Sequence, residues 1–263
     1  MNNLNMNLEK PSSSSSTTTT TTTTTSTSTT TTTDLVIHSH SAQHVDRLTL
    51  PYRLFTVREK TVKIHQANTS DGKGGTDIGF GAAVYPSSII MSHYLEHHAR
   101  IYHKTVLELG GGHGFSGIAA ALCGATSVIT TDGDDISLEL TQTNINENKV
   151  NANCKAIKLY WGDANDEANV LNCLNGNLPD IIIGSDITAC PYADALPKLL
   201  STLLNLSNEN TSIILSHKSR NIDEEAFWSE LATHFTIKSR DRVKHPDFAD
   251  DDTLHLSVLK KIK

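Results

Sequence analysis

An acidic residue followed by closely spaced glycines is the part of this sequence best suited to hold a ligand. Four glycines follow Glu108 within six positions: Gly110, Gly111, Gly112 and Gly114. Glycine adopts positive φ without strain and lets a ligand approach the backbone, and a helix that starts after such a turn offers N–H groups. Asp132 ends the next apolar segment, where a carboxylate can accept hydrogen bonds from both hydroxyls of a ribose. The two features together predict a ligand that contains a nucleoside.

The spacing of the glycines favours one kind of nucleoside ligand over another. A dinucleotide site has the pattern G-x-G-x-x-G, with its first glycine directly after the strand. Counted from Gly110, Phe115 stands where the third, helix-packing glycine would be. The pattern in register is G-x-G-x-G, which suits S-adenosylmethionine because this molecule has no pyrophosphate. We also find no second, substrate-binding domain of the kind that a nicotinamide enzyme of this size would show.

Alternating apolar and amphipathic segments supply the frame that would position these residues. Apolar runs predict buried parallel strands at 105–108, 127–131, 156–161, 180–184 and 211–216, followed by helices at 115–123, 135–148, 167–174, 196–204 and 226–235. A strand pair is expected at 236–243 and 253–260, a hairpin of strands 52–57 and 61–66 with 58–60 as its turn, and a helix at 86–98. The sequence thus predicts an α/β fold: a Rossmann-like, seven-stranded, mostly parallel sheet with one antiparallel strand, helices on both faces and an N-terminal β-hairpin. Within it, Asp135 is expected to cap the helix after Asp132.

Composition limits the classes of function. Lys and Arg number 22 against 29 Asp and Glu, a net charge of −7, which gives no basic footprint for a nucleic acid. No apolar run is long enough to span a membrane, there is no signal peptide, and the four cysteines are far apart, as in reduced intracellular proteins. Residues 11–33 are nearly all Ser and Thr, which cannot bury enough apolar surface to fold. We therefore expect a disordered tail over 1–45 and one folded domain over 46–263 that includes the hairpin at 52–66.

A different chemistry is suggested by a second motif. His93, Glu96 and His97 match H-x-x-E-H, a pattern of zinc hydrolases. A catalytic zinc needs a third protein ligand, and the apolar side of this helix leaves both histidines nearer the solvated face. A polar helix end is the favoured interpretation, and we expect no metal site.

Further short motifs occur in a fixed order around the glycine segment. They are Ile64-His65-Gln66, Gly81-Ala82-Ala83-Val84-Tyr85, Leu159-Tyr160-Trp161-Gly162 and Gly184-Ser185-Asp186. With the Glu108–Gly114 segment, they resemble the class I, seven-β-strand S-adenosylmethionine-dependent methyltransferases. More narrowly, the chain resembles the protein-lysine methyltransferase-like subfamily, methyltransferase family 16, which acts on non-histone proteins. The resemblance covers Tyr52 to Lys263.

The resemblance implies roles for individual residues. The methionine end of the cofactor would be held by Glu108 and Gly110–Gly112 with Gly114 in the same loop, the ribose by Asp132, the adenine by Trp161, and other parts by Ser185 and Tyr85. Asp186, by its position at the carboxyl edge of the sheet, would orient the substrate amine by accepting a hydrogen bond; the alternative is that it supports the glycine loop. The family's D-x-x-Y motif has Ala189 in place of its Tyr here, and Tyr192, three residues further on, would take over that space. Tyr85 stands where the family usually has Trp.

The function that follows is methyl transfer from S-adenosylmethionine to a lysine of a non-histone protein. Alternatives are another protein residue, a small molecule, and a catalytically inactive methyltransferase fold that binds a partner, with a zinc hydrolase as the most distant one. We expect a cytoplasmic monomer, with the nucleus as the other location. Its protein substrate would present a basic surface or be a chaperone or a translation-type protein, with no nucleic acid or membrane involved.

Overall fold

The computed structural model describes residues 47–48, 50–67, 79–189, 194–219, 224–242, 245–248 and 250–263. The predicted disordered tail and Tyr192 lie outside these residues. The strands are β1 (Tyr52–Val57), β2 (Lys60–His65), β3 (Thr105–Leu109), β4 (Ser127–Asp132), β5 (Cys154–Lys158), β6 (Ile181–Ser185), β7 (Ser212–Lys218), β8 (Phe235–Arg242) and β9 (Leu254–Lys261). The helices are α2 (Pro86–His97), α3 (Phe115–Leu122), α4 (Asp135–Glu147), α5 (Ala164–Cys173), α6 (Ala195–Asn205) and α7 (Glu224–His234), with 3-10 turns η1 (Gly79–Ala82), η2 (Ile187–Ala189) and η3 (Pro246–Phe248).

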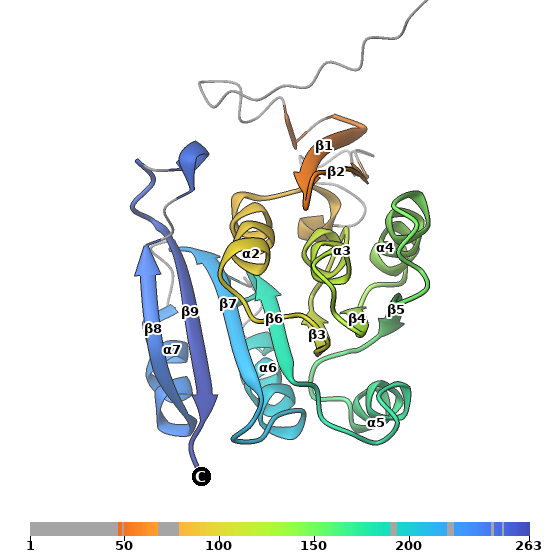
Figure 1. Cartoon of the computed structure of the whole chain (residues 1–263). Helices are drawn as coiled ribbons and strands as arrows, with labels where there is room; N and C mark the ends of the chain where they lie inside the picture. Colours follow the sequence, from red (N-terminus) through yellow and green to blue (C-terminus); the bar gives the residue numbers. More distant parts are fainter. Residues whose placement is uncertain are drawn as a thin grey trace, which may run out of the picture. The chain divides into compact units, whose positions relative to one another are not determined.

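Seven strands form one sheet in the order β5-β4-β3-β6-β7-β9-β8 (Figure 1). Strands β3 to β7 pair in parallel, and β9 runs antiparallel to both of its neighbours, β7 and β8. This confirms the predicted fold class. From β3 the chain builds outward to β4 and β5, and it then returns to place β6 on the other side of β3. The carboxyl ends of β3 and β6 therefore flank the point where strand order reverses, which is where sheets of this kind bind ligands.

Two apolar cores cover the two faces of the sheet, because alternate residues of each strand point to opposite sides. Val106 and Val128 belong to one core, which they share with α2 and α3. Leu107 and Ile129 belong to the other, which they share with α5, α6 and α7. Figure 1 shows the two sets of helices on opposite sides of the sheet. The apolar runs of β3, β4, β6 and β7 are thus strands buried on both faces, whereas β5, at the edge of the sheet, is buried only at Cys154.

The β1–β2 hairpin packs on the helices of the first face. Val62 and Ile64 are buried in the first core, and the ring of Phe55 stacks on that of Phe115 in α3 at 4.3 Å between centroids. Arg58 and Glu59 alone form the turn, with φ angles of 50° and 63°, as two-residue turns between twisted strands require. The predicted turn over 58–60 is one residue too long.

Two local predictions on the β4–β5 side are wrong. The strand predicted at 156–161 is β5 at Cys154–Lys158. It ends early because its partner β4 ends at Asp132, whose carbonyl accepts the last bond of the pairing from the Leu159 N–H at 2.9 Å; the chain then turns into α5, capped by Asp163. The cap of α4 is Asp134 instead of Asp135, since its carboxylate accepts the N–H of Ser137 at 2.7 Å.

The described helices include none that is long and apolar enough to cross a membrane. Cys123 and Cys154 are buried free thiols and Cys173 is a half-buried one, as their spacing predicts; Cys190 lies outside the described residues. Burial raises the pKa of Cys123 to about 11, so this thiol stays protonated and unreactive.

Candidate active site

The glycine loop joins β3 to α3 at the reversal point of the sheet. Gly110, Gly112 and Gly114 have φ angles of 61°, 56° and 76°, so alternate positions of the loop use the left-handed conformation that favours glycine. A methyl group added at Gly112 would lie 2.8 Å from the Cα of Gly81, because η1 passes directly over the loop. The loop therefore has the G-x-G-x-G register that the sequence predicts.

Gly117 lies in the first turn of α3 and packs closely against β3 and β4. An added Cβ would lie 2.1 Å from the Thr130 hydroxyl oxygen and 2.7 Å from Oε2 of Glu108. This position therefore lets α3 pack closely on β3 and β4, which is the role of the third glycine in a dinucleotide site. The predicted absence of a helix-packing glycine is wrong, and glycine spacing alone does not decide between the two ligands.

Glu108 lies beneath the loop. Its side chain is buried, and Oε2 accepts the N–H of Gly117 at 3.0 Å. Burial raises the pKa of Glu108 to about 7, although the Thr130 hydroxyl and the Gly117 N–H act in the opposite direction. The carboxyl group thus secures the start of α3, and any effect that it has on the methionine end of a cofactor would pass through the loop.

Asp132, at the end of β4, closes the other side of the loop. Its Oδ2 accepts the N–H of Gly112 at 2.9 Å, and its Oδ1 accepts the N–H of Asp134 at 3.1 Å. The N–H of Gly133 also acts on this carboxylate. A carboxylate offers about four acceptor positions, so capacity remains for further donors, which the hydroxyls of a ribose fit. Burial raises the pKa of Asp132.

Three large side chains lie near the glycine loop and the end of β4. A Cβ added at Gly110 would lie 3.2 Å from the ring of Trp161. A Cβ added at Gly133 would lie 3.0 Å from the ring of Tyr160. Tyr160 is 58% exposed, and Ile136, in the first turn of α4, is 49% exposed. Exposed apolar surface of this kind suits a purine ring. The sequence motifs named Trp161 as a candidate but not Tyr160 or Ile136, which the structure adds as candidates because they are exposed and lie close in sequence to Trp161 and Asp132.

Ser185 and Asp186 lie at the carboxyl end of β6, across the crevice from the loop. The Ser185 hydroxyl oxygen is 3.1 Å from that of Ser116 in α3 and 3.3 Å from that of Ser216 in β7. Asp186 has a φ angle of 62°, donates its N–H to the Ser216 carbonyl at 2.7 Å and accepts the N–H of Lys218 on Oδ1 at 3.1 Å. These contacts fix the direction of the Asp186 carboxylate.

Tyr85 precedes the first turn of α2 and is half-buried. Its carbonyl accepts the Ser88 hydroxyl at 2.8 Å, and the preceding residue, Val84, donates its N–H to Gln66 at 2.8 Å. Gln66 also donates to the carbonyls of Arg47 and Leu50, at 3.0 and 2.8 Å. The glutamine of the I-x-Q motif therefore positions the backbone next to Tyr85, a function that the sequence motif did not reveal.

The H-x-x-E-H motif occupies the end of α2. The rings of His93 and His97 stack at 4.3 Å between centroids and 22° between planes. Nearly parallel, stacked rings do not direct their in-plane nitrogen lone pairs to one point. Over the described ranges of the chain, no group of three or more His, Cys, Asp or Glu side chains is arranged to hold a metal ion.

Two solved structures that share this fold are described as methyltransferases. A putative S-adenosylmethionine-dependent methyltransferase from Streptococcus mutans is similar with a TM-score of 0.54 and 17% identity over 81% of this chain and 56% of that chain. A putative methyltransferase in complex with SAH is similar with a TM-score of 0.57 and 19% identity over 81% of this chain and 56% of that chain. The fold is therefore that of the methyltransferase class.

Sequence comparison defines the family within this class. The model of a family described as lysine methyltransferase matches residues 65–234. Protein N-lysine methyltransferase METTL21A from Danio rerio is 33% identical over 165 residues, 61% of this chain and 71% of that protein. Protein-lysine methyltransferase METTL21E from Mus musculus is 32% identical over 188 residues, 66% of this chain and 69% of that protein. The chain belongs to the lysine methyltransferase family, as its motifs predict.

Proposed function

We propose that this chain transfers a methyl group from S-adenosylmethionine to a lysine side chain of a non-histone protein. The observation that carries the proposal is the loop between β3 and α3, in which alternate glycines have positive φ and the Asp132 carboxylate holds the Gly112 N–H at 2.9 Å. Membership of the lysine methyltransferase family supports the chemistry, and the printed names of the relatives support a protein substrate.

The cofactor would lie across the glycine loop. Gly110, Gly111, Gly112 and Gly114 would hold its methionine end with indirect support from Glu108, and Asp132 would bind both ribose hydroxyls. Trp161 would flank the adenine with Tyr160 and Ile136. Ser185 would contact the cofactor through its backbone, and Tyr85 would cover it. The remaining acceptor capacity of Asp132 and the exposed apolar side chains near it support this placement.

S-adenosylmethionine, when bound, supplies an electrophilic methyl group on a positively charged sulfur. A lysine attacks as a neutral amine, so the site must favour loss of its proton and align the nitrogen lone pair with the methyl group. Asp186 would accept a hydrogen bond from the amine and so orient it, because the Lys218 N–H fixes the direction of this carboxylate. Tyr192, which lies outside the described residues, would line the lysine channel in place of the tyrosine that Ala189 replaces.

The substrate would meet an acidic protein. The chain carries a net charge of −7, which complements a substrate with a basic surface; a chaperone or a translation-type protein is the other candidate class. The protein would act as a monomer in the cytoplasm, with the nucleus as the other location.

Methyl transfer into proteins tests this proposal. The purified full chain is incubated with methyl-labelled S-adenosylmethionine and a cell lysate, with Asp132→Ala as the control. We expect label in one or a few protein bands with the wild type and none with the variant. Label confined to small molecules would overturn the protein substrate, and failure of the wild type to bind the cofactor would overturn the activity.

A further inference from the structure

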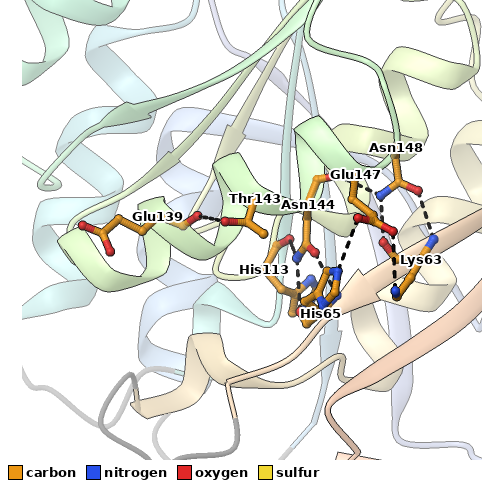
Figure 2. Close-up of polar contacts among 8 residues, drawn as sticks. All are labelled: Lys63, His65, His113, Glu139, Thr143, Asn144, Glu147 and Asn148. Carbon is orange, nitrogen blue, oxygen red and sulfur yellow. Dashed lines mark hydrogen bonds and ion pairs between the residues drawn. The ribbon is translucent and has the colours of Figure 1, made fainter.

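We propose that Asn144, in α4, is a positioning residue that links the β1–β2 hairpin to the cofactor loop, so that cofactor binding and docking of the hairpin strengthen each other. The inference extends the proposed function, because it takes the glycine loop to be the cofactor site. Its evidence is a set of hydrogen bonds around one buried carboxamide (Figure 2).

Asn144 is fully buried and uses every hydrogen-bonding group of its side chain in the link. Its Oδ1 accepts the N–H of His65 at 2.8 Å, and its Nδ2 donates to the His65 carbonyl at 3.1 Å. The second proton of Nδ2 goes to the carbonyl of His113, in the glycine loop, at 2.8 Å. One carboxamide therefore binds β2 and the loop at the same time, and it has no donor left over.

Asn148 repeats the contact with β2 but has no contact with the loop. Its Oδ1 accepts the N–H of Lys63 at 3.0 Å, and its Nδ2 donates to the Lys63 carbonyl at 2.8 Å and to the Asn144 carbonyl at 2.8 Å. Four residues of a helix rise by about 6 Å, and two residues of a strand by about 6.6 Å. Asn144 and Asn148, four positions apart in α4, therefore match His65 and Lys63, two positions apart in β2, which runs in the opposite direction. The outer edge of β2 is thus paired with side chains of α4 as if with a third strand.

The same face of α4 holds the loop at a second point. Thr141, one turn before Asn144, donates its hydroxyl to the Gly112 carbonyl at 2.5 Å. His113 itself is buried and neutral, because burial lowers its pKa to about 3 and its Nδ1 accepts the N–H of Phe115 at 3.2 Å. Asn144 therefore contacts the backbone carbonyl of His113 and not its ring. A loop fixed by cofactor keeps this carbonyl in place, and the carbonyl in turn keeps the carboxamide aligned with β2.

Matched variants separate this link from simple stabilisation. Asn144→Ala and Asn148→Ala each remove one pair of bonds to β2, but only the first removes the bond to His113. We expect Asn144→Ala to raise the KM for S-adenosylmethionine and the Kd for S-adenosylhomocysteine about tenfold relative to Asn148→Ala, with kcat at saturating cofactor within about twofold. Equal changes in the two variants, or a loss confined to kcat, would overturn the proposal.

Hydrogen exchange of the wild-type chain gives a second test that needs no variant. We expect S-adenosylhomocysteine to slow exchange of the His65 amide, which Asn144 accepts, more than exchange of the Lys63 amide, which Asn148 accepts. The same effect on both amides would overturn the link. Asp132→Ala distinguishes failure of the proposed function from failure of this link. If Asp132→Ala binds the cofactor as the wild type does, the cofactor site itself is misplaced. If Asp132→Ala does not bind the cofactor but the two asparagine variants behave alike, only the link is wrong.

Discussion

On the β3–β4 side of the crevice, the groups that face a ligand are backbone atoms of a glycine loop held by the carboxylate of Asp132. On the β6–β7 side, the comparable group is the carboxylate of Asp186, a side chain that the N–H of Lys218 holds in place. We therefore propose the first side as the cofactor side and Asp186, on the second, as the group of the substrate side that meets the amine.

Loss of the Asp132 carboxylate should have the largest effect. Asp132→Ala removes two charge-assisted hydrogen bonds to ribose, which should lower the affinity for S-adenosylhomocysteine roughly 10³-fold in calorimetric titration. Asp134→Ala is the control. It removes the N-cap of α4, a hydrogen bond from the Ser137 N–H, and should cost about 1 kcal/mol in stability, but it removes no proposed contact with the ligand. Similar affinities for the two variants would contradict the assignment of the β4 end to ribose.

Glu108 should make the stability of the cofactor side depend on pH. Its pKa of about 7 in the folded chain lies above the ordinary 4.5, so the folded state binds more protons between these values. The free energy of unfolding should therefore fall by about 3 kcal/mol as pH rises through this window. Glu108→Gln should abolish this fall, as measured by urea unfolding at about pH 5 and about pH 8. If the free energies of unfolding of the wild type and of Glu108→Gln differ by the same amount at both pH values, Glu108 does not titrate in this way.

A pair of glycine substitutions tests whether the loop needs close packing as well as positive φ. Gly112 and Gly176 have φ angles of 56° and 78°, but an added Cβ meets Gly81 at 2.8 Å in the first case and nothing within 4 Å in the second. Gly112→Ala should reduce the free energy of unfolding by about 2 kcal/mol more than Gly176→Ala, in urea titrations. Equal losses would mean that η1 does not constrain the loop.

Asp186→Asn should give the smallest effect and sharpen the substrate side. Asparagine keeps an oxygen to accept the Lys218 N–H and tolerates positive φ, so the fold is retained while the charge is lost. We expect kcat to fall about tenfold, with the Kd for S-adenosylhomocysteine unchanged. Weaker cofactor binding with normal kcat would move Asp186 to the cofactor side.

The cofactor side could be predicted from sequence because its determinants are local. Glu108, the alternate glycines and Asp132 follow directly from strand ends, and buried strands appear as apolar runs. The family motifs then placed Trp161, although the strand before it was predicted too far along the chain. That strand ends at Lys158 because its partner β4 ends at Asp132, a tertiary limit that the apolar run itself does not record.

Contacts between distant segments could not be predicted. Gly117 packs against Thr130, and Asn144 contacts both His65 and His113, although each of these residues is unremarkable within its own helix. The spacing of Asn144 and Asn148 is a signal in hindsight, since it becomes informative only when β2 is known to lie along α4. The role predicted for Tyr192 in the lysine channel stays a prediction, because this residue lies outside the described part of the chain.

The nature of the methylated residue tests the central claim most directly. Protein labelled with methyl groups in a lysate is hydrolysed to amino acids, and the labelled product is compared with methylated standards. We predict that the label travels with a methyl-lysine and is absent when Asp132→Ala replaces the wild type. Label in another amino acid, or label that does not depend on Asp132, would contradict the account.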